Sequence, residues 1–195
     1  MRVDLEIIRS WIAPNSRVLD LGCGDGSLMA MLRGDGHTCV GLEIDADNIQ
    51  TCVDKGLSVI EQNLDLGLPN FADKCMDMVV MTQTLQAVHY PDKVLLELLR
   101  VGREGVVAFP NFGNWRCRYY LGFRGRMPVS KFMPYSWYDT PNIHFCTILD
   151  FEQLCADLGI SIVERMVVDE QGHSDWLTSS MPNLFGTTAI YKIRK

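Results

Sequence analysis

The residues best suited to chemistry in this chain stand in one short run, Val-Leu-Asp-Leu-Gly-Cys-Gly-Asp-Gly, from Val18 to Gly26. Its apolar start is typical of a buried strand. One glycine after it would suit an ordinary strand-to-helix turn, but three at alternate positions favour a loop whose backbone N–H groups face a ligand. We therefore predict a site for a nucleotide-like molecule. Its residues in this run are Asp20, Gly22, Cys23, Gly24 and Gly26.

A carboxylate further along the chain is predicted to complete this site. Glu43 closes the next expected strand, 21 positions after Gly22. In a doubly wound sheet the ligand lies beyond the carboxyl ends of the strands, so Glu43 and its neighbour Ile44 should come close to the glycine loop. A carboxylate there can accept hydrogen bonds from both ribose hydroxyls of an adenosine group. The alternative is a solvated acid at a strand end, which the glycine loop disfavours.

The spacing of the glycines separates two classes of cofactor. Dinucleotide sites carry Gly-x-Gly-x-x-Gly with a pyrophosphate at the helix N-terminus, whereas this loop reads Gly-x-Gly-x-Gly. The carboxylates of Asp20 and Asp25 would repel pyrophosphate, but they suit the ammonium and sulfonium charges of S-adenosylmethionine. The chain is also too short to add a separate dehydrogenase substrate domain. We therefore expect S-adenosylmethionine, or its demethylated product S-adenosylhomocysteine, as the ligand.

Apolar patterning predicts the elements that position these residues. Helical periods alternate with short apolar runs, which is typical of a doubly wound α/β fold, with a mostly parallel sheet of about seven strands and helices on both faces. We predict one domain, 1–195, with an irregular insertion at about 110–146 after the fifth strand, and a loop at 169–186. Expected helices are 5–12, 27–33, 47–55, 92–100 and 150–158, and expected strands are 18–21, 38–43, 57–60, 76–81, 105–109, 160–168 and 187–193.

Composition restricts the classes of binding partner and the cellular compartment. With 195 residues, 47% of them hydrophobic, the chain fits one globular domain, and its net charge of -6 argues against nucleic acid and anionic membranes. The seven cysteines have no metal-ligand spacing, so we expect free thiols in a reducing cytosol and no metal site. The N-terminal Met-Arg-Val-Asp-Leu-Glu lacks the apolar core of a signal peptide, and no apolar run has membrane-spanning length. These features predict a soluble cytoplasmic protein.

The glycine loop, followed by Gly41-Leu42-Glu43, resembles motifs one and two of class I S-adenosylmethionine-dependent methyltransferases. The resemblance implies their Rossmann-like fold and further ligand residues. Asp65, in Asn-Leu-Asp-Leu, matches the acid that meets the adenine amino group, although it could equally be a turn residue. The strand that ends at Thr82 matches the fourth strand, beside the cofactor. Leu66 and Thr82 therefore join the expected ligand-binding residues.

Three segments in the second half of the chain carry a more specific resemblance. They are Phe-Pro-Asn-Phe-Gly-Asn-Trp at 109–115, Thr-Pro-Asn-Ile-His-Phe-Cys-Thr at 140–147 and Pro-Asn-Leu-Phe at 182–185. They resemble the MetW family of bacterial methionine-biosynthesis proteins, and the resemblance covers nearly the whole chain. It implies a role beside homoserine O-acyltransferase, the MetX enzyme, whose activity or assembly MetW proteins support. We therefore expect a non-catalytic or weakly catalytic S-adenosylmethionine-binding partner of that enzyme.

The alternative hypothesis is an active methyltransferase on a small molecule or a protein. Transfer from a sulfonium needs mainly positioning and exclusion of water, so a missing catalytic base is weak evidence against it. The motifs of nucleic-acid methyltransferases, Asn/Asp-Pro-Pro-aromatic and Pro-Cys, do not occur. His89 and His144 are the candidate bases, but no acid at motif spacing orients either, which favours structural roles. His37 and His173 are expected to be exposed.

A segment rich in aromatic and basic residues follows the fifth strand. Residues 109–138 hold ten of the chain's 18 aromatic residues and no acid. Three interpretations are open: a cap over the sheet, a substrate lid, and a docking face for another protein, since aromatic residues and Arg are enriched at interfaces. A cap and a docking face are compatible and are favoured over a lid, and nucleic-acid binding comes last because of the net charge. The cations of the segment are Arg116, Arg118, Arg124, Arg126 and Lys131.

Overall fold

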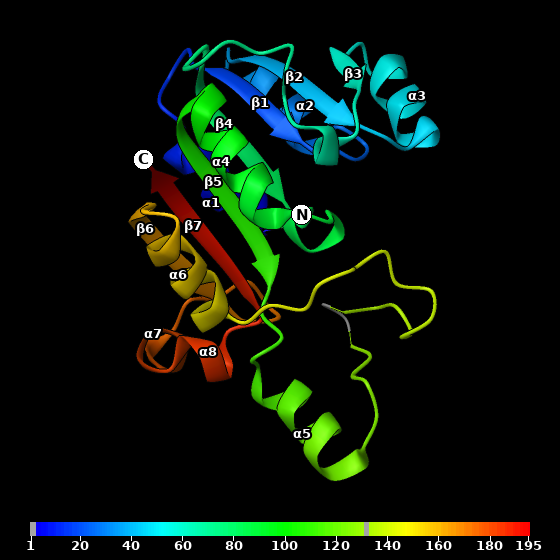
Figure 1. Ribbon diagram of the computed structural model, residues 1–195, viewed down its shortest axis with the longest axis vertical. Coiled ribbons are helices and arrows are strands. Elements are labelled where there is room, and N and C mark those ends of the chain that lie inside the picture. Colours follow the sequence, from blue (N-terminus) through cyan, green and yellow to red (C-terminus); the bar gives the residue numbers. More distant parts are fainter. Residues whose placement is uncertain (1–2, 131–132) are drawn as a thin grey trace.

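The computed structural model of the chain describes residues 3–130 and 133–195, which contain a seven-stranded sheet (Figure 1). Lys131 of the insertion, and Met1 and Arg2 of the N-terminal segment, lie outside the described residues. The strand order is β3-β2-β1-β4-β5-β7-β6, and β7 runs antiparallel to both of its neighbours while the other pairs are parallel. The predicted mostly parallel sheet is confirmed. The strands are β1 Arg17–Leu21, β2 Thr38–Glu43, β3 Val59–Glu61, β4 Met76–Thr82, β5 Gly102–Pro110, β6 Ser161–Val168 and β7 Thr188–Arg194.

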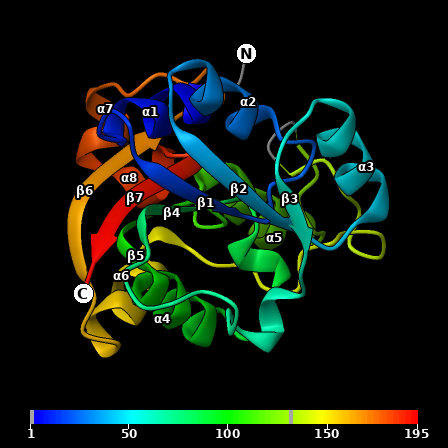
Figure 2. The same ribbon diagram turned by 90° about the horizontal axis from the view of Figure 1, so that it is seen from above.

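Helices cover both faces of the sheet, as expected (Figure 2). Side chains of β4 alternate between two apolar clusters: Met78 and Val80 pack with residues of α1 and α2, and Val79 and Met81 pack with residues of α4 and α6. Because both faces are buried, the strand is almost continuously apolar in sequence. The helices on the sheet are α1 Val3–Trp11, α2 Ser27–Gly34, α3 Ala46–Asp54, α4 Pro91–Val101 and α6 Ile148–Asp157.

The strand order places the site. From β1 the chain adds β2 and β3 on one side, whereas β4 and β5 lie on the other. The connections that leave β1 and β4 therefore diverge, which opens a crevice at their carboxyl ends. Two short 3-10 helices border this crevice, η1 Leu64–Leu66 after β3 and η2 Leu85–Ala87 after β4.

Three helices lie where irregular chain was predicted, and these expectations were wrong. They are α5 Trp115–Arg124, α7 Trp176–Ser180 and α8 Pro182–Phe185. Of the residues of α5 only Cys117 is buried, so this helix lacks the apolar stripe by which a core-facing helix is identified in a sequence. It extends away from the sheet (Figure 1). The helices α7 and α8 span five and four residues, too few to show a helical period.

The predicted exposure of His37 was also wrong. Its side chain is only 8% exposed, and its Nδ1 accepts the Ser16 N–H at 3.2 Å. This bond joins the turn before β1 to the turn before β2 and satisfies the buried ring. His173 is exposed, as expected.

The cysteines are all free thiols, as predicted, and four of them are buried. No described helix is long and apolar enough to cross a membrane. Within residues 3–130 and 133–195, no group of three His, Cys, Asp or Glu residues is arranged to hold a metal ion.

Candidate functional site

A cavity of about 230 Å³ opens beside the carboxyl ends of β1 and β2, where the strand order reverses. The glycine loop, the end of β2, the segment around η1 and the segment around η2 surround it. Of the predicted site residues, Gly22, Glu43, Ile44 and Asp65 form part of its wall. The other wall residues are Leu42, Gln62, Asn63, Leu64, Thr84, Ala87, Val88 and His89.

The glycine loop adopts backbone angles that favour glycine. Gly22, Gly24 and Gly26 have φ values of +71°, +54° and +74°, which would cost another residue about 1–2 kcal/mol each. A side chain on Gly22 would meet Thr84 at 2.5 Å, whereas one on Gly24 would meet nothing within 4 Å. The loop therefore packs tightly at Gly22 and leaves open space beside the Cα of Gly24. The expectation that its N–H groups face a ligand was wrong, because those of Gly22, Cys23, Gly24 and Gly26 all donate within the chain.

The Glu43 carboxylate ties this loop to the end of β2. It is 9% exposed. Its Oε2 accepts the Gly24 N–H at 2.7 Å, and its Oε1 accepts the N–H groups of Ile44 and Asp45 at 2.8 and 3.1 Å. A carboxylate offers about four acceptor positions, so one is left for a hydroxyl of a ligand.

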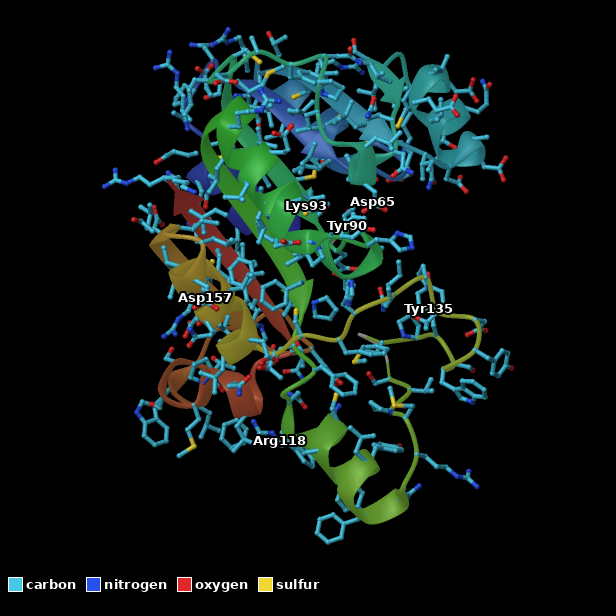
Figure 3. All side chains as sticks on the ribbon, viewed as in Figure 1. Asp65, Tyr90, Lys93, Arg118, Tyr135 and Asp157 are labelled. Atoms are coloured by element: carbon cyan, nitrogen blue, oxygen red, sulfur yellow. The ribbon has the colours of Figure 1, made fainter. Side chains whose placement is uncertain are left out.

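Asp65 and His89 form a pair on the opposite wall. Oδ2 of Asp65 lies 2.7 Å from Nδ1 of His89, and Oδ1 accepts the His89 N–H at 2.8 Å. Burial raises the pKa of Asp65, but hydrogen bonds from His89 and Tyr90 outweigh it and hold the pKa of this carboxyl below its ordinary value of 3.8. Figure 3 shows Asp65 next to Tyr90. No acid at motif spacing was predicted to orient His89, and the acid that pairs with it, Asp65, stands 24 residues earlier in the chain, on η1.

The turn after β4 contributes Thr84, which the sequence analysis missed. Gln83 has φ +54°, a left-handed conformation that is unusual for a residue with a side chain, and its N–H donates to the Ala108 carbonyl at 2.7 Å. This turn brings the Thr84 hydroxyl to 3.4 Å from the Gly22 carbonyl and 3.1 Å from that of Thr82. A left-handed Gln leaves no signal in a single sequence.

Other predicted residues lie next to the cavity but outside its wall. Asp20 and Cys23 are 1% and 8% exposed. The Cys23 thiol lies 4.0 Å from that of Cys52, and burial raises the pKa of Cys23, so this thiol stays protonated. Leu66, 75% exposed, follows Asp65 on η1.

The electrostatic character of the wall follows from its carboxylates. Glu43 and Asp65 belong to it, and its described residues include no Lys or Arg. Asp25 is turned elsewhere: its Oδ2 lies 3.0 Å from the Lys55 ammonium, and hydrogen bonds from Ser27 and Lys55 lower its pKa. Such a wall disfavours pyrophosphate and accepts a neutral or cationic ligand.

Comparison with known proteins identifies the family. The family model described as methionine biosynthesis protein MetW matches residues 2–193. The chain belongs to the MetW family. A bifunctional methionine biosynthesis protein MetXA/MetW from Rhodopirellula baltica is 35% identical over 200 residues, which cover 97% of this chain and 32% of that relative. The chain thus spans about a third of the length of this relative.

Solved structures share the fold. The S-adenosylmethionine-dependent methyltransferase from Mesorhizobium loti gives a TM-score of 0.72 at 14% identity, with 100% of this chain and 98% of that one covered. An S-adenosylmethionine-dependent methyltransferase from Methanosarcina mazei gives a TM-score of 0.71 at 16% identity, with 97% of this chain and 96% of that one covered. The chain has the class I methyltransferase fold, and at these identities the likeness concerns the fold alone.

Two of the MetW-like segments meet at the base of the insertion. Asn111, fully buried, donates from Nδ2 to the carbonyls of Asn183 and Gly186 at 3.1 and 3.0 Å, and its Oδ1 accepts the Gly113 N–H at 2.9 Å. Asn114 also donates to the Gly186 carbonyl, at 3.0 Å, and caps α5. Segments 109–115 and 182–185 therefore form a clamp that fixes the root of α5 against α8.

The third MetW-like segment joins the insertion to the cavity wall. The N–H groups of Ile143 and His144 donate to the Gln86 carbonyl at 2.8 and 3.0 Å, and Nε2 of His144 lies 3.4 Å from the His89 carbonyl. Gln86 belongs to η2, whose last residue, Ala87, lines the cavity. The returning end of the insertion is thus bonded to the wall of the candidate site.

Proposed function

We propose that this chain binds S-adenosylmethionine, or S-adenosylhomocysteine, and supports homoserine O-acyltransferase, the MetX enzyme, in methionine biosynthesis. The observation that carries the proposal is the relative whose name unites MetXA and MetW in one bifunctional protein. Fusion raises the effective concentration of one part at the other, which is useful when the two act together. The seven free thiols support a reducing cytoplasm as the compartment.

The cavity supports the ligand part of this proposal. Glu43 is buried at the end of β2 with one acceptor position left for a ribose hydroxyl, and the bare backbone at Gly24 allows close approach. Ile44 and Val88 provide apolar wall for an adenine ring, and Asp65 keeps acceptor capacity for its amino group. The negative wall matches a sulfonium. The side chains and backbone that contact the ligand would then be supported by five further residues next to the cavity: Asp20, Cys23, Gly26, Leu66 and Thr82.

Calorimetric titration of the full chain with S-adenosylmethionine tests the ligand. Glu43→Gln removes the charge and one acceptor, so affinity should fall by at least about tenfold, since hydrogen bonds to charged groups are worth about 1.5–3 kcal/mol. The matched control is Glu61→Gln, because Glu61 ends the neighbouring strand in register with Glu43 but lies outside the cavity wall. Equal losses in both variants would contradict the assignment of Glu43.

The partner is tested separately. Purified homoserine O-acyltransferase should work faster, or assemble better, with this chain present than without it. A second arm adds S-adenosylmethionine, which is made from methionine and could therefore report the level of the end product, provided that it binds the free and complexed chain differently. If the rate and the assembly of the acyltransferase are the same with and without this chain, the partner proposal is overturned and the ligand proposal stands.

One observation favours a second function, methyl transfer to a small molecule or a protein. The Asp65–His89 pair lines the cavity, and because Nδ1 of His89 faces the carboxylate, Nε2 is left to accept a proton from an acceptor substrate. This function requires a binding mode in which S-adenosylmethionine directs its activated methyl group toward His89, and Asp65 then orients His89 and does not bind adenine. Labelled methyl should reach a cell component, and at saturating S-adenosylmethionine His89→Ala should slow this transfer by about 10²–10⁴-fold. Unlabelled cell components after incubation with the parent chain would exclude this function.

A further inference from the structure

The exposed apolar side chains of the described chain are concentrated in one segment of the sequence. Ten of its 21 exposed large apolar side chains lie between residues 115 and 145. Phe123 is 83% exposed, and Trp137 and Tyr138 are each 73% exposed. A segment with so many exposed apolar side chains indicates an interaction surface, because leaving them in water forfeits about 25 cal/mol for each Å² that could be buried.

The helix α5 carries an ordered part of this surface. Trp115, Tyr119 and Phe123 follow one another at a spacing of four, so they form one stripe along the helix, and all three are exposed. The rings of Tyr119 and Phe123 stack at 5.4 Å between centroids. On the same helix Cys117 is fully buried. The helix thus presents its aromatic stripe outward, the arrangement by which a helix inserts into a groove of another protein.

The charges beside this stripe indicate an acidic partner surface. No acid occurs from 109 to 138, in a chain whose net charge is -6. Arg116 is engaged by Glu170, and Arg118 donates to the Gly113 carbonyl at 2.6 Å. Figure 3 shows Arg118 at the root of α5. Arg124 stacks on Tyr120 at 5.4 Å, and in the described part of the chain it has no acidic partner. An aromatic centre with a cationic rim is the usual composition of a protein-binding hot spot.

We propose that the outward stripe of α5 is the surface that docks onto homoserine O-acyltransferase. This inference rests on the proposed function for the identity of the partner. The Rhodopirellula relative supports that occupant, because this chain corresponds to 32% of a protein also named MetXA. The clamp of Asn111 and Asn114 holds the stripe in position. The stripe enters a groove with acidic borders on that enzyme.

Biolayer interferometry between the purified acyltransferase and the full chain tests this surface. The double variant Tyr119→Ser/Phe123→Ser should weaken association by at least about tenfold. The matched control is Trp176→Ser, because Trp176 is 77% exposed on α7, outside residues 110–146, and its variant should bind within about twofold of the parent. Arg124→Glu should mainly slow association and reduce its salt dependence. Thermal melting of each variant establishes that it is folded.

The outcomes separate the two proposals. If the double variant binds the acyltransferase as tightly as the parent chain does, the docking surface is overturned and the partnership stays intact. A parent chain with no affinity for the enzyme would overturn both. If sedimentation instead shows that the double variant loses self-association while acyltransferase binding stays unchanged, the stripe is a contact between two copies of this chain, and the proposal is likewise overturned.

Discussion

The cavity and the insertion are built on opposite principles, although they touch at Gln86 and His89. In the cavity, polar groups satisfy one another: Glu43 accepts three backbone N–H groups, and Asp65 binds His89 twice. In the insertion, the clamp fixes the root of α5, and several aromatic side chains beyond it, among them Phe123, Trp137 and Tyr138, are exposed to water. The polar groups of the cavity are thus largely satisfied within this chain, whereas the outer insertion leaves apolar side chains exposed.

The two regions differ in how precisely their side chains must be positioned. Residues that bind a small ligand must be held to fractions of an ångström, so strand ends and a tight glycine loop position them. Residues that bind a protein need only a fixed root, because complementarity over a large area supplies the rest. Changes in the cavity should therefore cost stability or ligand affinity, while changes at the outer insertion should cost neither.

The largest effect is expected at Gly22. Gly22→Ala adds a Cβ that would meet Thr84 at 2.5 Å and forces a side chain into φ +71°, so the free energy of unfolding should fall by about 2–4 kcal/mol and S-adenosylmethionine binding should be lost. Gly24→Ala is the matched control, since its Cβ meets nothing within 4 Å and only the strain of about 1 kcal/mol applies. Urea denaturation measures both. Equal destabilisation would show that strain alone, without the contact to Thr84, shapes the loop.

A somewhat smaller effect is expected at the clamp. Asn111→Ala removes a fully buried amide. The carbonyls of Asn183 and Gly186 lose its N–H donor and the Gly113 N–H loses its acceptor, so the free energy of unfolding should fall by about 2–3 kcal/mol. Trypsin should cut α5 faster, while S-adenosylmethionine binding should persist. Asn70→Ala, at an exposed asparagine, is the control. Loss of ligand binding in Asn111→Ala would show that the two regions are one cooperative unit.

These two regions also differ in how far their sequence predicts them. The mostly parallel sheet of about seven strands and the proximity of Glu43 to the glycine loop follow from apolar runs and from the rule that strand ends meet at the ligand, whereas the strand order and the antiparallel β7 do not. The Asp65–His89 pair does not, because its two residues are 24 positions apart in the chain and are brought together by η1 and by the turn that follows η2. The helix α5 was missed for a different reason. Its only helical signal in the sequence is the spacing of Trp115, Tyr119 and Phe123, three residues among many aromatic and basic neighbours, and only Cys117 is buried.

A pH-dependent effect of about 1 kcal/mol is expected at Asp65. The folded protein holds the pKa of this carboxyl below 3.8, so the ionised form stabilises the fold above that pH, and this contribution is lost as the pH falls through the folded pKa. Asp65→Asn should therefore be less stable than the parent at neutral pH and equally stable in strong acid. Asp139→Asn, at an exposed acid, should match the parent throughout. Denaturant midpoints across pH 2–7 measure the difference, and a gap that persists in acid would contradict the charged contact.

The smallest effect is expected at the tip of α5. Phe123 is 83% exposed, so Phe123→Ala should change the free energy of unfolding of the isolated chain by less than about 0.5 kcal/mol. Phe112 is the matched position within the same segment, because it is half-buried and its ring lies 4.8 Å from that of Phe145. Phe112→Ala should cost about 1–2 kcal/mol. Equal losses would mean that the tip of α5 packs on its own chain, and the aromatic stripe would then be a stabilising contact within the fold, with no partner required to cover it.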